Sequence, residues 1–180
     1  MSLEGSHRFA TACGPVAVQW TALGIARVRL IEFATGGDAE PGEGVATLPP
    51  LAADCVRRVV ACLAGEPVDF SDLALDETGI GSLETAIYRE LRRVPRGSTV
   101  TYGELAARVG APKAAQAVGA AMARNPWPIV VPCHRVLAAG GRLGGFSAPG
   151  GARTKRRLLR MEGVDLDHGM ALLPGLFDEA

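Results

Sequence analysis

A cysteine and a histidine stand side by side in the stretch VVPCHRV, residues 130–136, behind a proline and inside an apolar run. A cysteine thiolate is a strong nucleophile, and histidine is the side chain best suited to take up a proton near neutral pH. Adjacency alone does not aim two side chains at each other, so the chain must bend at Pro132 or a water must bridge Cys133 and His134. Three interpretations of Cys133 are open: a nucleophile, a metal ligand or a buried structural thiol.

A base of this kind needs a third group to orient it, and Glu162 is the candidate. Glu162 stands at the C-terminal end of an expected helix, where a negative charge meets the negative end of the helix dipole. That position costs roughly a few tenths of a kcal/mol. The residue is therefore either a tolerated surface glutamate or one placed to hold His134.

The remaining cysteines and histidines give no sign of a metal or redox centre. The four cysteines contain no C-x-x-C pair, and the three histidines are widely spaced. Cys55 and Cys62 lie seven residues apart in an apolar helical pattern and are expected to fill a core. We therefore expect reduced thiols, no metal and no cofactor.

Composition predicts an ordinary packed protein. The chain has 180 residues, of which 48% are hydrophobic, which suits one larger domain or two small ones. No signal peptide is recognisable, and no apolar run approaches the length of a membrane span. We expect a cytoplasmic protein without a membrane partner, which acts as a monomer.

The net charge of zero hides a strong asymmetry. Residues 1–81 hold five Arg or Lys and eleven Asp or Glu, a net charge of −6. Residues 82–163 hold fourteen bases and four acids, a net charge of +10, and residues 164–180 hold four acids and no base. A basic segment of this size indicates an anionic partner, and the footprint is typical of nucleic-acid binding. A solvated basic face without a partner is the competing interpretation.

The first half of the chain reads as a small α/β domain, residues 1–81. The stretches GPVAVQWT and GIARVRLIEF alternate and predict two antiparallel strands. The stretch PPLAADCVRRVVACLAG places apolar residues at helical spacing and predicts a helix. Residues 66–81 are acidic and irregular and suit a linker.

The second half, residues 82–180, reads as a mainly helical domain. A helix is expected from Ser82, which would cap it, to about Arg93. Two shorter helices follow, one from about Gly103 and one started by Pro112 over 112–124, which together form a helix-turn-helix pattern. A glycine-rich loop and a basic helix ending in MEG complete the domain, and the tail is expected to pack through its leucines and Phe177. The fold class is therefore α/β, with an antiparallel sheet in the first domain and a helix-turn-helix in the second.

The block NPWPIVVPCHRV, with TYGELA before it and KRRLLRMEG after it, resembles the O6-alkylguanine-DNA alkyltransferases, also called methylated-DNA–protein-cysteine methyltransferases. The resemblance covers about residues 82–163, with the motifs in family order and spacing, and follows the first half only by its strand-strand-helix outline. It implies repair of double-stranded DNA containing O6-alkylguanine. The alkyl group would pass irreversibly to Cys133, His134 would take the thiol proton through water, and Glu162 would orient His134.

The resemblance also implies the residues that bind the flipped guanine. Tyr102 would rotate the nucleotide and bond the base, and Asn125 would brace the turn between the recognition helix and the active site. The carbonyls of Cys133 and Val136 would accept from the guanine amine, and the N–H of Gly144 would donate to the guanine oxygen.

The resemblance places the helix-turn-helix in the minor groove, with 112–124 as its recognition helix. This explains the alanines and glycines of that helix, which otherwise suit tight packing on a neighbouring helix. The residues expected at the DNA are Gln116, Ala117, Arg124 and Arg135, the last with a structural role beside the site.

The chain departs from the family at three positions. The arginine that family members insert into the base stack falls at Gln116, a hydroxyl residue of the glycine-rich loop falls at Gly144, and a tryptophan falls at Tyr88. Two rival functions stay open: a non-catalytic protein that binds alkylated DNA on the same scaffold, and a helix-turn-helix regulator with Cys133 in its core. The joint presence of Cys133, His134 and Glu162 favours catalysis.

Overall fold

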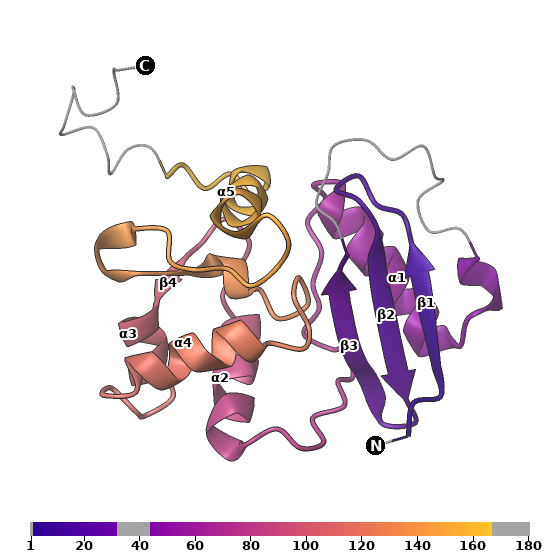
Figure 1. Ribbon diagram of the computed structural model, residues 1–180, viewed down its shortest axis with the longest axis horizontal. Coiled ribbons are helices and arrows are strands. Elements are labelled where there is room, and N and C mark those ends of the chain that lie inside the picture. Colours follow the sequence, from indigo (N-terminus) through magenta and orange to yellow (C-terminus); the bar gives the residue numbers. More distant parts are fainter. Residues whose placement is uncertain (1, 32–43, 167–180) are drawn as a thin grey trace.

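The computed structural model describes residues 2–31 and 44–166 of the chain. It consists of a small sheet backed by one helix and, beside it, a group of helices that carries the rest of the chain (Figure 1). This arrangement agrees with the expected fold class.

The sheet has three antiparallel strands in the order β1-β2-β3. They are β1 (Gly5–Phe9), β2 (Val16–Thr21) and β3 (Gly24–Leu30). Strand residues alternate between buried and exposed, and helix α1 (Pro50–Leu63) covers the buried face with Val56 and Val59. The amphipathic pattern thus sets which face of the sheet meets the core.

Strand β1 is absent from the sequence-based expectation. Its sequence, GSHRF, contains one large apolar residue and no clear alternation. Its place comes from its pairing with β2, where Gly5 lies opposite Trp20. A Cβ at Gly5 would lie 2.3 Å from the Trp20 ring, so only glycine fits there.

The helical part contains α2 (Ser82–Arg92), α3 (Tyr102–Arg108), α4 (Ala115–Arg124) and α5 (Gly151–Met161). Helix α3 begins with a capping box, in which the Thr101 hydroxyl accepts from the Glu104 N–H and the Glu104 carboxylate accepts from the Thr101 N–H. Two expected starts shift: Ser82 is the first residue of α2 rather than its cap, and α4 begins three residues after Pro112.

Shorter elements connect the helices near the expected site. Strand β4 (Val100–Thr101) pairs in parallel with β5 (Val136–Leu137), and a 3-10 turn, η2 (Cys133–Arg135), precedes β5. Two further 3-10 turns are η1 (Val45–Thr47) and η3 (Ala139–Gly141). The β4–β5 pair holds the chain after η2 against the start of α3.

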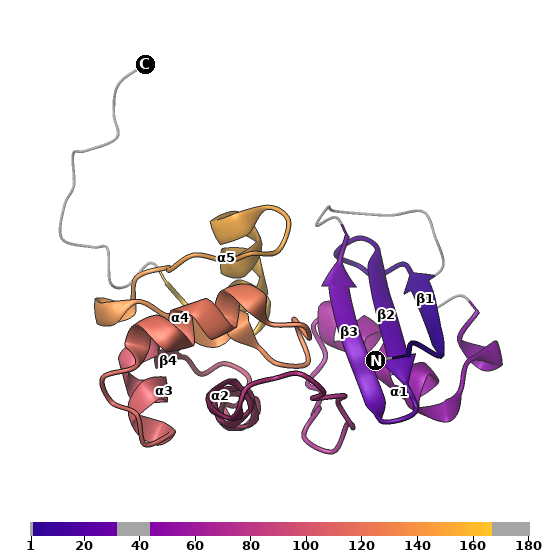
Figure 2. The ribbon, with the colours of Figure 1, turned by 60° about the horizontal axis from the view of Figure 1, so that its bottom comes forward.

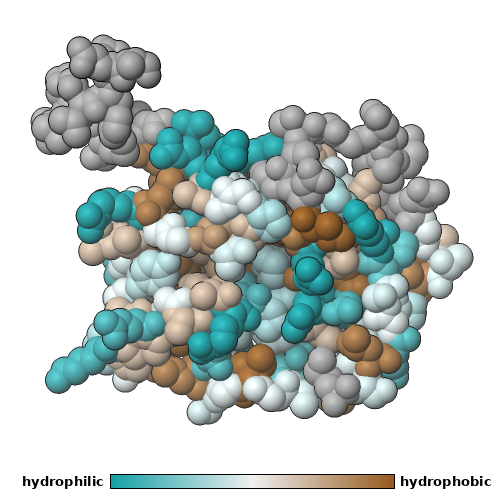
Figure 3. All heavy atoms as spheres, in the orientation of Figure 1, coloured by the Kyte–Doolittle hydropathy of each residue, from teal (hydrophilic) through white to brown (hydrophobic). Residues whose placement is uncertain are grey.

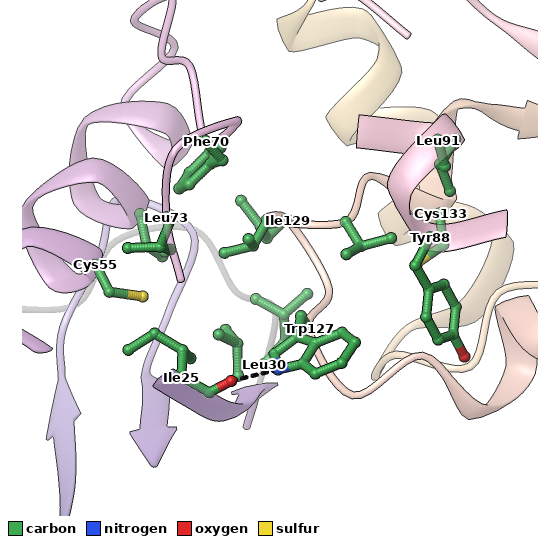
Figure 4. Packing of buried hydrophobic residues seen from close by; sticks show 14 of the residues in the cluster. Ile25, Leu30, Cys55, Phe70, Leu73, Tyr88, Leu91, Trp127, Ile129 and Cys133 are labelled. Carbon is green, nitrogen blue, oxygen red and sulfur yellow. Dashed lines mark hydrogen bonds between the residues drawn. The ribbon is translucent and has the colours of Figure 1, made fainter. Parts of the chain in front are cut away.

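One continuous apolar core joins the sheet to the helices. Figure 4 shows Ile129 between Phe70 and Leu73 on one side and Tyr88 on the other. Trp127 is 1% exposed, its indole N–H donates to the Ile25 carbonyl at 2.7 Å, and its ring meets Tyr88 edge-on at 5.7 Å between centroids. Tyr88, at the position where the family has tryptophan, is therefore a buried packing residue.

The expected packing of the tail through Phe177 falls outside the described residues. Within the described ranges, no helix is long and apolar enough to cross a membrane.

Candidate active site

Cys133 lies in a tight turn at the edge of the core. It opens η2 directly after Pro132, and its N–H donates to the Val131 carbonyl at 2.8 Å. Four residues earlier, Ile129 has a φ of 76°, which is costly for a β-branched side chain. The turn is thus held by its surroundings in a shape the chain would not adopt alone, which is frequent near functional groups.

His134, Arg135 and Glu162 form a buried ionic cluster. The Glu162 carboxylate lies 2.9 Å from His134 Nε2 and accepts from Arg135 Nε at 2.9 Å and from Arg135 Nη2 at 2.8 Å. The His134 and Glu162 side chains are 2% and 4% exposed. Arg135 also donates to the Val94 carbonyl at 2.6 Å. Of the two alternatives left open for Glu162, the geometry shows the one in which its carboxylate contacts His134.

The electrostatics of the cluster fix which nitrogen of His134 is basic. Burial alone would raise the pKa of Glu162, but the hydrogen bonds from His134 and Arg135 bring it down to about 2. Burial lowers the pKa of His134 and outweighs the opposing effect of Glu162, so the ring is neutral near pH 7. A neutral ring beside an ionised carboxylate carries its proton on Nε2. The lone pair therefore lies on Nδ1, which is buried and has no hydrogen-bond partner within the described residues.

The Cys133 sulfur rests as a thiol. Burial raises its pKa, and Asn125 and the Lys155 ammonium act in the opposite direction. A thiol and a neutral histidine, adjacent in sequence, are the residue types that a base-activated nucleophile requires.

Asn125 braces the loop that leads to Cys133. Its Nδ2 donates to the Val131 carbonyl at 2.8 Å, and its Oδ1 accepts from the Trp127 N–H at 3.0 Å. The residue therefore ties the end of α4 to the chain just before the cysteine, where the sequence had placed a brace.

Two cavities meet at Cys133. One has a volume of about 410 Å³ and is lined by Tyr102, Gly119, Met122, Ala123, Cys133, Gly145, Phe146 and Ser147. The other, of about 430 Å³, shares Cys133, Ala123, Phe146 and Ser147 and extends to β3. Such volumes are in the range of small-ligand sites.

Gly144 has a different surrounding from the one expected of a residue facing the cysteine. A Cβ at Gly144 would lie 2.8 Å from the Tyr102 hydroxyl oxygen, so glycine permits the close approach of Tyr102. The residue with a hydroxyl that does line both cavities is Ser147. Sequence analysis missed Ser147, because the glycine-rich loop can be aligned with the family motif in several ways.

Lys155 is a second residue that sequence analysis missed. It is 0% exposed, and its Nζ donates to the Val136 carbonyl and, at 3.5 Å, to the Gly145 carbonyl. Burial lowers its pKa to about 8, against the attraction of Cys133. A fully buried lysine is rare, and only its place in a basic helix next to leucines could have hinted at this.

The residues expected at the DNA separate into two groups. Gln116 is exposed and Ala117 is partly exposed on α4, and exposed Arg124 pairs with Glu84 at 2.8 Å. Arg135, by contrast, is buried, and its guanidinium is held by Glu162 and Val94. Its part in the site is therefore structural rather than contact with DNA.

Known proteins match both the chain and its shape. Residues 82–164 match the family model described as "6-O-methylguanine DNA methyltransferase, DNA binding domain". The methylated-DNA--protein-cysteine methyltransferase of Methanothermobacter thermautotrophicus is 37% identical over 155 residues, covering 84% of this chain and 81% of that protein. The chain belongs to the O6-methylguanine-DNA methyltransferase family.

Two other proteins are similar to this methyltransferase-family chain over most of their length. A protein of Thermus thermophilus named "DNA base-flipping protein" is 39% identical, covering 86% of this chain and 97% of that protein. The crystal structure of Mycobacterium tuberculosis OGT in complex with DNA has a TM-score of 0.69 and 31% identity, covering 92% of this chain and 98% of that one. The similarity thus extends over both the sheet and the helical part.

Proposed function

We propose that this protein repairs DNA by moving an alkyl group from O6 of guanine onto Cys133, irreversibly and once per molecule. The observation that carries the proposal is the buried array of Cys133, His134 and Glu162 beside a cavity of about 410 Å³. A regulator without chemistry would have no need of a buried carboxylate that fixes the tautomer of a histidine next to a thiol.

In the proposed reaction, the Nε2–H group of His134 donates a hydrogen bond to the Glu162 carboxylate. The unprotonated Nδ1 is therefore the nitrogen that acts as the base. Nδ1 takes the thiol proton of Cys133 through a water molecule. The sulfur then forms a bond to the alkyl carbon while the bond from that carbon to O6 breaks, and O6 keeps the electron pair. Hydrogen bonds to O6 stabilise this developing charge, and the departing guanine anion takes up a proton from water while His134 releases the one it accepted. The thioether is stable, so the protein is consumed.

The flipped guanine would occupy the cavity that Tyr102 lines. Tyr102 would bond the base, Asn125 would keep the loop in shape, and the carbonyls of Cys133 and Val136 would accept from the guanine amine. Val136 already accepts from Lys155, so its second lone pair would serve the amine. The donor to O6 would come from the loop of Gly144, and Ser147 is its best-placed residue with a hydroxyl.

Helices α3 and α4 would dock on double-stranded DNA, with Gln116 at the base stack and Ala117 and Arg124 near the backbone. In this proposal residues 82–180 form the alkyltransferase domain and residues 1–81 a separate domain. The protein would act as a monomer in the cytoplasm, associated with the nucleoid when on DNA.

Mass spectrometry of the intact protein after mixing with DNA that contains O6-methylguanine tests the proposal. The expected result is the mass of one added methyl group, located on Cys133 by peptide mapping. Cys133→Ser should bind the same DNA and gain no mass. A methyl group on Cys55 or Cys62, or transfer by the serine variant, would contradict the assignment.

A second candidate function is recognition of alkylated DNA without transfer. It is favoured by the 39% identity to a protein named as a base-flipping protein. Tight binding of the methylated duplex by wild type, with no gain in mass after long incubation, would establish this function instead.

A further inference from the structure

We propose that the outer face of the N-terminal sheet binds the phosphate backbone of the same duplex whose guanine enters the active site. The residues concerned are Arg8, Arg27 and Arg29, called here the sheet arginines. The inference rests on the proposed function for the identity of the duplex, and it adds a DNA-binding surface outside the helix-turn-helix.

Strand register places the sheet arginines together. Ala17 of β2 lies opposite Arg8 of β1 on one side and opposite Arg29 of β3 on the other. Arg27 is two residues from Arg29 and therefore projects from the same face. The small side chain of Ala17 leaves the space between Arg8 and Arg29 open, so the face carries three cations in neighbouring positions.

This face is the one turned away from the core. Val28 lies between Arg27 and Arg29 and is 2% exposed, because it points toward α1. The three arginines themselves are exposed. The outer face of the sheet is thus accessible along its whole width.

Among the described residues, the sheet arginines have no acidic partner. The ion pairs found within residues 2–31 and 44–166 involve other arginines, such as Arg58 with Asp54 and Arg89 with Glu77. This is notable in a half of the chain with a net charge of −6, where acids are plentiful. Guanidinium groups without an acidic partner keep their donors for an outside anion, and the planar guanidinium fork can donate to two phosphate oxygens at once.

The sheet arginines lie on the same side of the molecule as the expected recognition helix. In Figure 1, α1 lies behind the sheet and one end of α4 lies in front of α2, so the outer face of the sheet and the exposed face of α4 are turned the same way, and Figure 2 again shows α1 behind the sheet. Figure 3 shows this side, with hydrophilic side chains gathered near its centre. A rod-like ligand lying on α4 can therefore extend over the sheet.

A cavity joins the two parts of this surface. The 430 Å³ cavity has Arg27 and Arg29 in its lining together with Arg124 and Asn125 at the end of α4, and it reaches Cys133. The backbone of β3 is tied directly to this region, because the Val28 N–H donates to the Pro126 carbonyl at 2.8 Å. The sheet arginines are therefore at a fixed position relative to the nucleophile.

A polyanion with regular phosphates is the ligand that fits separate, exposed cations held on a rigid sheet. Backbone contacts of this kind position a duplex without reading its sequence. They also matter more in this chain than in one with an arginine at the base stack, since Gln116 contributes no charge to DNA binding.

The test compares the salt dependence of DNA binding for wild type and for the double variant Arg27→Gln/Arg29→Gln. Two duplexes are used, one of about three helical turns, roughly 30 base pairs, and one of about one turn, roughly 10 base pairs. On the long duplex, the slope of log K against log salt should fall by about 0.9 per lost phosphate contact, hence by about 2. On the short duplex, which still reaches the cavity shared by Arg27, Arg29 and Arg124, the slope should fall by at most the same amount.

Arg57→Gln is the matched control, because Arg57 is exposed on α1, at the other side of the sheet. It removes the same kind of charge from the same half and should leave both slopes unchanged. Thermal unfolding confirms that all variants fold. Methyl transfer by wild type on the short duplex is measured in parallel, so that failure of the proposed function is recorded separately.

The inference would be overturned by an unchanged slope for the double variant on the long duplex, or by an equal fall in slope for Arg57→Gln. If the unchanged slope comes with slower transfer only from guanine adducts that carry a carboxylate, these arginines contact the adduct and not the DNA backbone.

Discussion

The site depends on a single buried carboxylate. Glu162 accepts three hydrogen bonds from His134 and Arg135. Its side chain is only 4% exposed, so water contributes little to stabilising its charge. Removing one partner of a buried pair leaves the other charge uncompensated, which is far more costly than losing a surface pair. The orientation of the base and the stability of the loop are thus held by the same group.

Glu162→Gln should therefore lower both stability and activity. The neutral amide leaves the Arg135 guanidinium buried without a counter-charge, and the free energy of unfolding should fall by about 3–5 kcal/mol. Urea unfolding measures this, and single-turnover methyl transfer should slow in parallel. Glu84→Gln, which breaks the exposed pair with Arg124, is the control and should cost at most about 1 kcal/mol. Equal losses in the two variants would contradict the buried-cluster argument.

The same cluster sets how stability responds to acid. The pKa of Glu162 is about 2 in the fold against an ordinary value of 4.5, so its contribution is complete above pH 4.5 and is lost as the pH falls toward 2. The pKa of His134 is lowered from 6.5, so the unfolded chain binds more protons just below that pH and stability falls there too. Unfolding measured from pH 7 to pH 3 should show a steady loss. Glu162→Gln should flatten the part below pH 4.5, and a parallel curve would contradict this.

Lys155 is expected to act on the thiol through its charge. Its ammonium lowers the pKa of Cys133 against the effect of burial, and its Nζ is fixed by the Val136 carbonyl. Lys155→Met keeps most of the apolar stem and removes the charge, so the thiolate becomes less accessible. Methyl transfer from free O6-methylguanine should slow at pH 7 and recover as the pH rises. A merely structural role would lower stability without moving the pH profile.

At this scale the sequence predicted the residues that sit in a fixed motif and missed those brought in by folding. Cys133 and His134 are adjacent, and Glu162 follows at the end of a helix, so the sequence named all three as candidates, and the structure brings Glu162 to His134. Ser147 reaches the site because a glycine-rich loop folds back over it, and Lys155 reaches it from helix α5. No periodicity in that loop fixes which residue faces the cavity.

Among the elements, α4 has a surface with few large or charged side chains. Apart from Arg124 at its end, its surface carries Gln116, Ala123 and the partly exposed Ala117, which are small or neutral and so allow close approach to a groove. Close approach helps positioning, but unstacking a base still costs on the order of a few kcal/mol, which an inserted side chain must offset.

Gln116→Arg should therefore speed methyl transfer from duplex DNA. A flat cation fills the gap left by the flipped base and gains from the field of the phosphates, whereas glutamine is shorter and neutral. Transfer from free O6-methylguanine needs no flipping and should keep the wild-type rate, which makes it the internal control. Unchanged duplex rates in a normally folded variant would show that Gln116 is not at the base stack.

Helices were easier to predict than strands for a physical reason. An amphipathic helix such as α2 or α5 carries its pattern within its own sequence. Its observed ends therefore lie within a few residues of the predicted ones. Strand β1 and the two-residue strands β4 and β5 are specified by partners distant in the chain. Pairing partners are not visible in local composition, so these elements were absent from the prediction.

At the scale of the molecule, the loop before Cys133 also contacts the N-terminal sheet. Val28 and Ile25 of β3 bond Pro126 and Trp127, which lie just after Asn125. The apolar core continues across this junction (Figure 4). The sheet therefore holds the loop of Cys133 from outside, which gives the first half of the chain a function beyond its own stability.

Trp127→Phe tests whether the two parts unfold as one. The variant keeps an aromatic ring but loses the bond to the Ile25 carbonyl, which retains its bond from the Asp76 N–H at 2.9 Å. The lost hydrogen bond should lower the free energy of unfolding by about 1 kcal/mol, in addition to the cost of the smaller buried ring. Because the core is continuous, amide hydrogen exchange should accelerate by the same factor in β3 and in α2, about fivefold for each kcal/mol lost. Trp20→Phe is the control for the loss of indole volume, since Trp20 lies within the sheet.

Faster exchange confined to one part after Trp127→Phe would show that the sheet and the helices unfold separately. It would also show that the sheet does not hold the nucleophile loop.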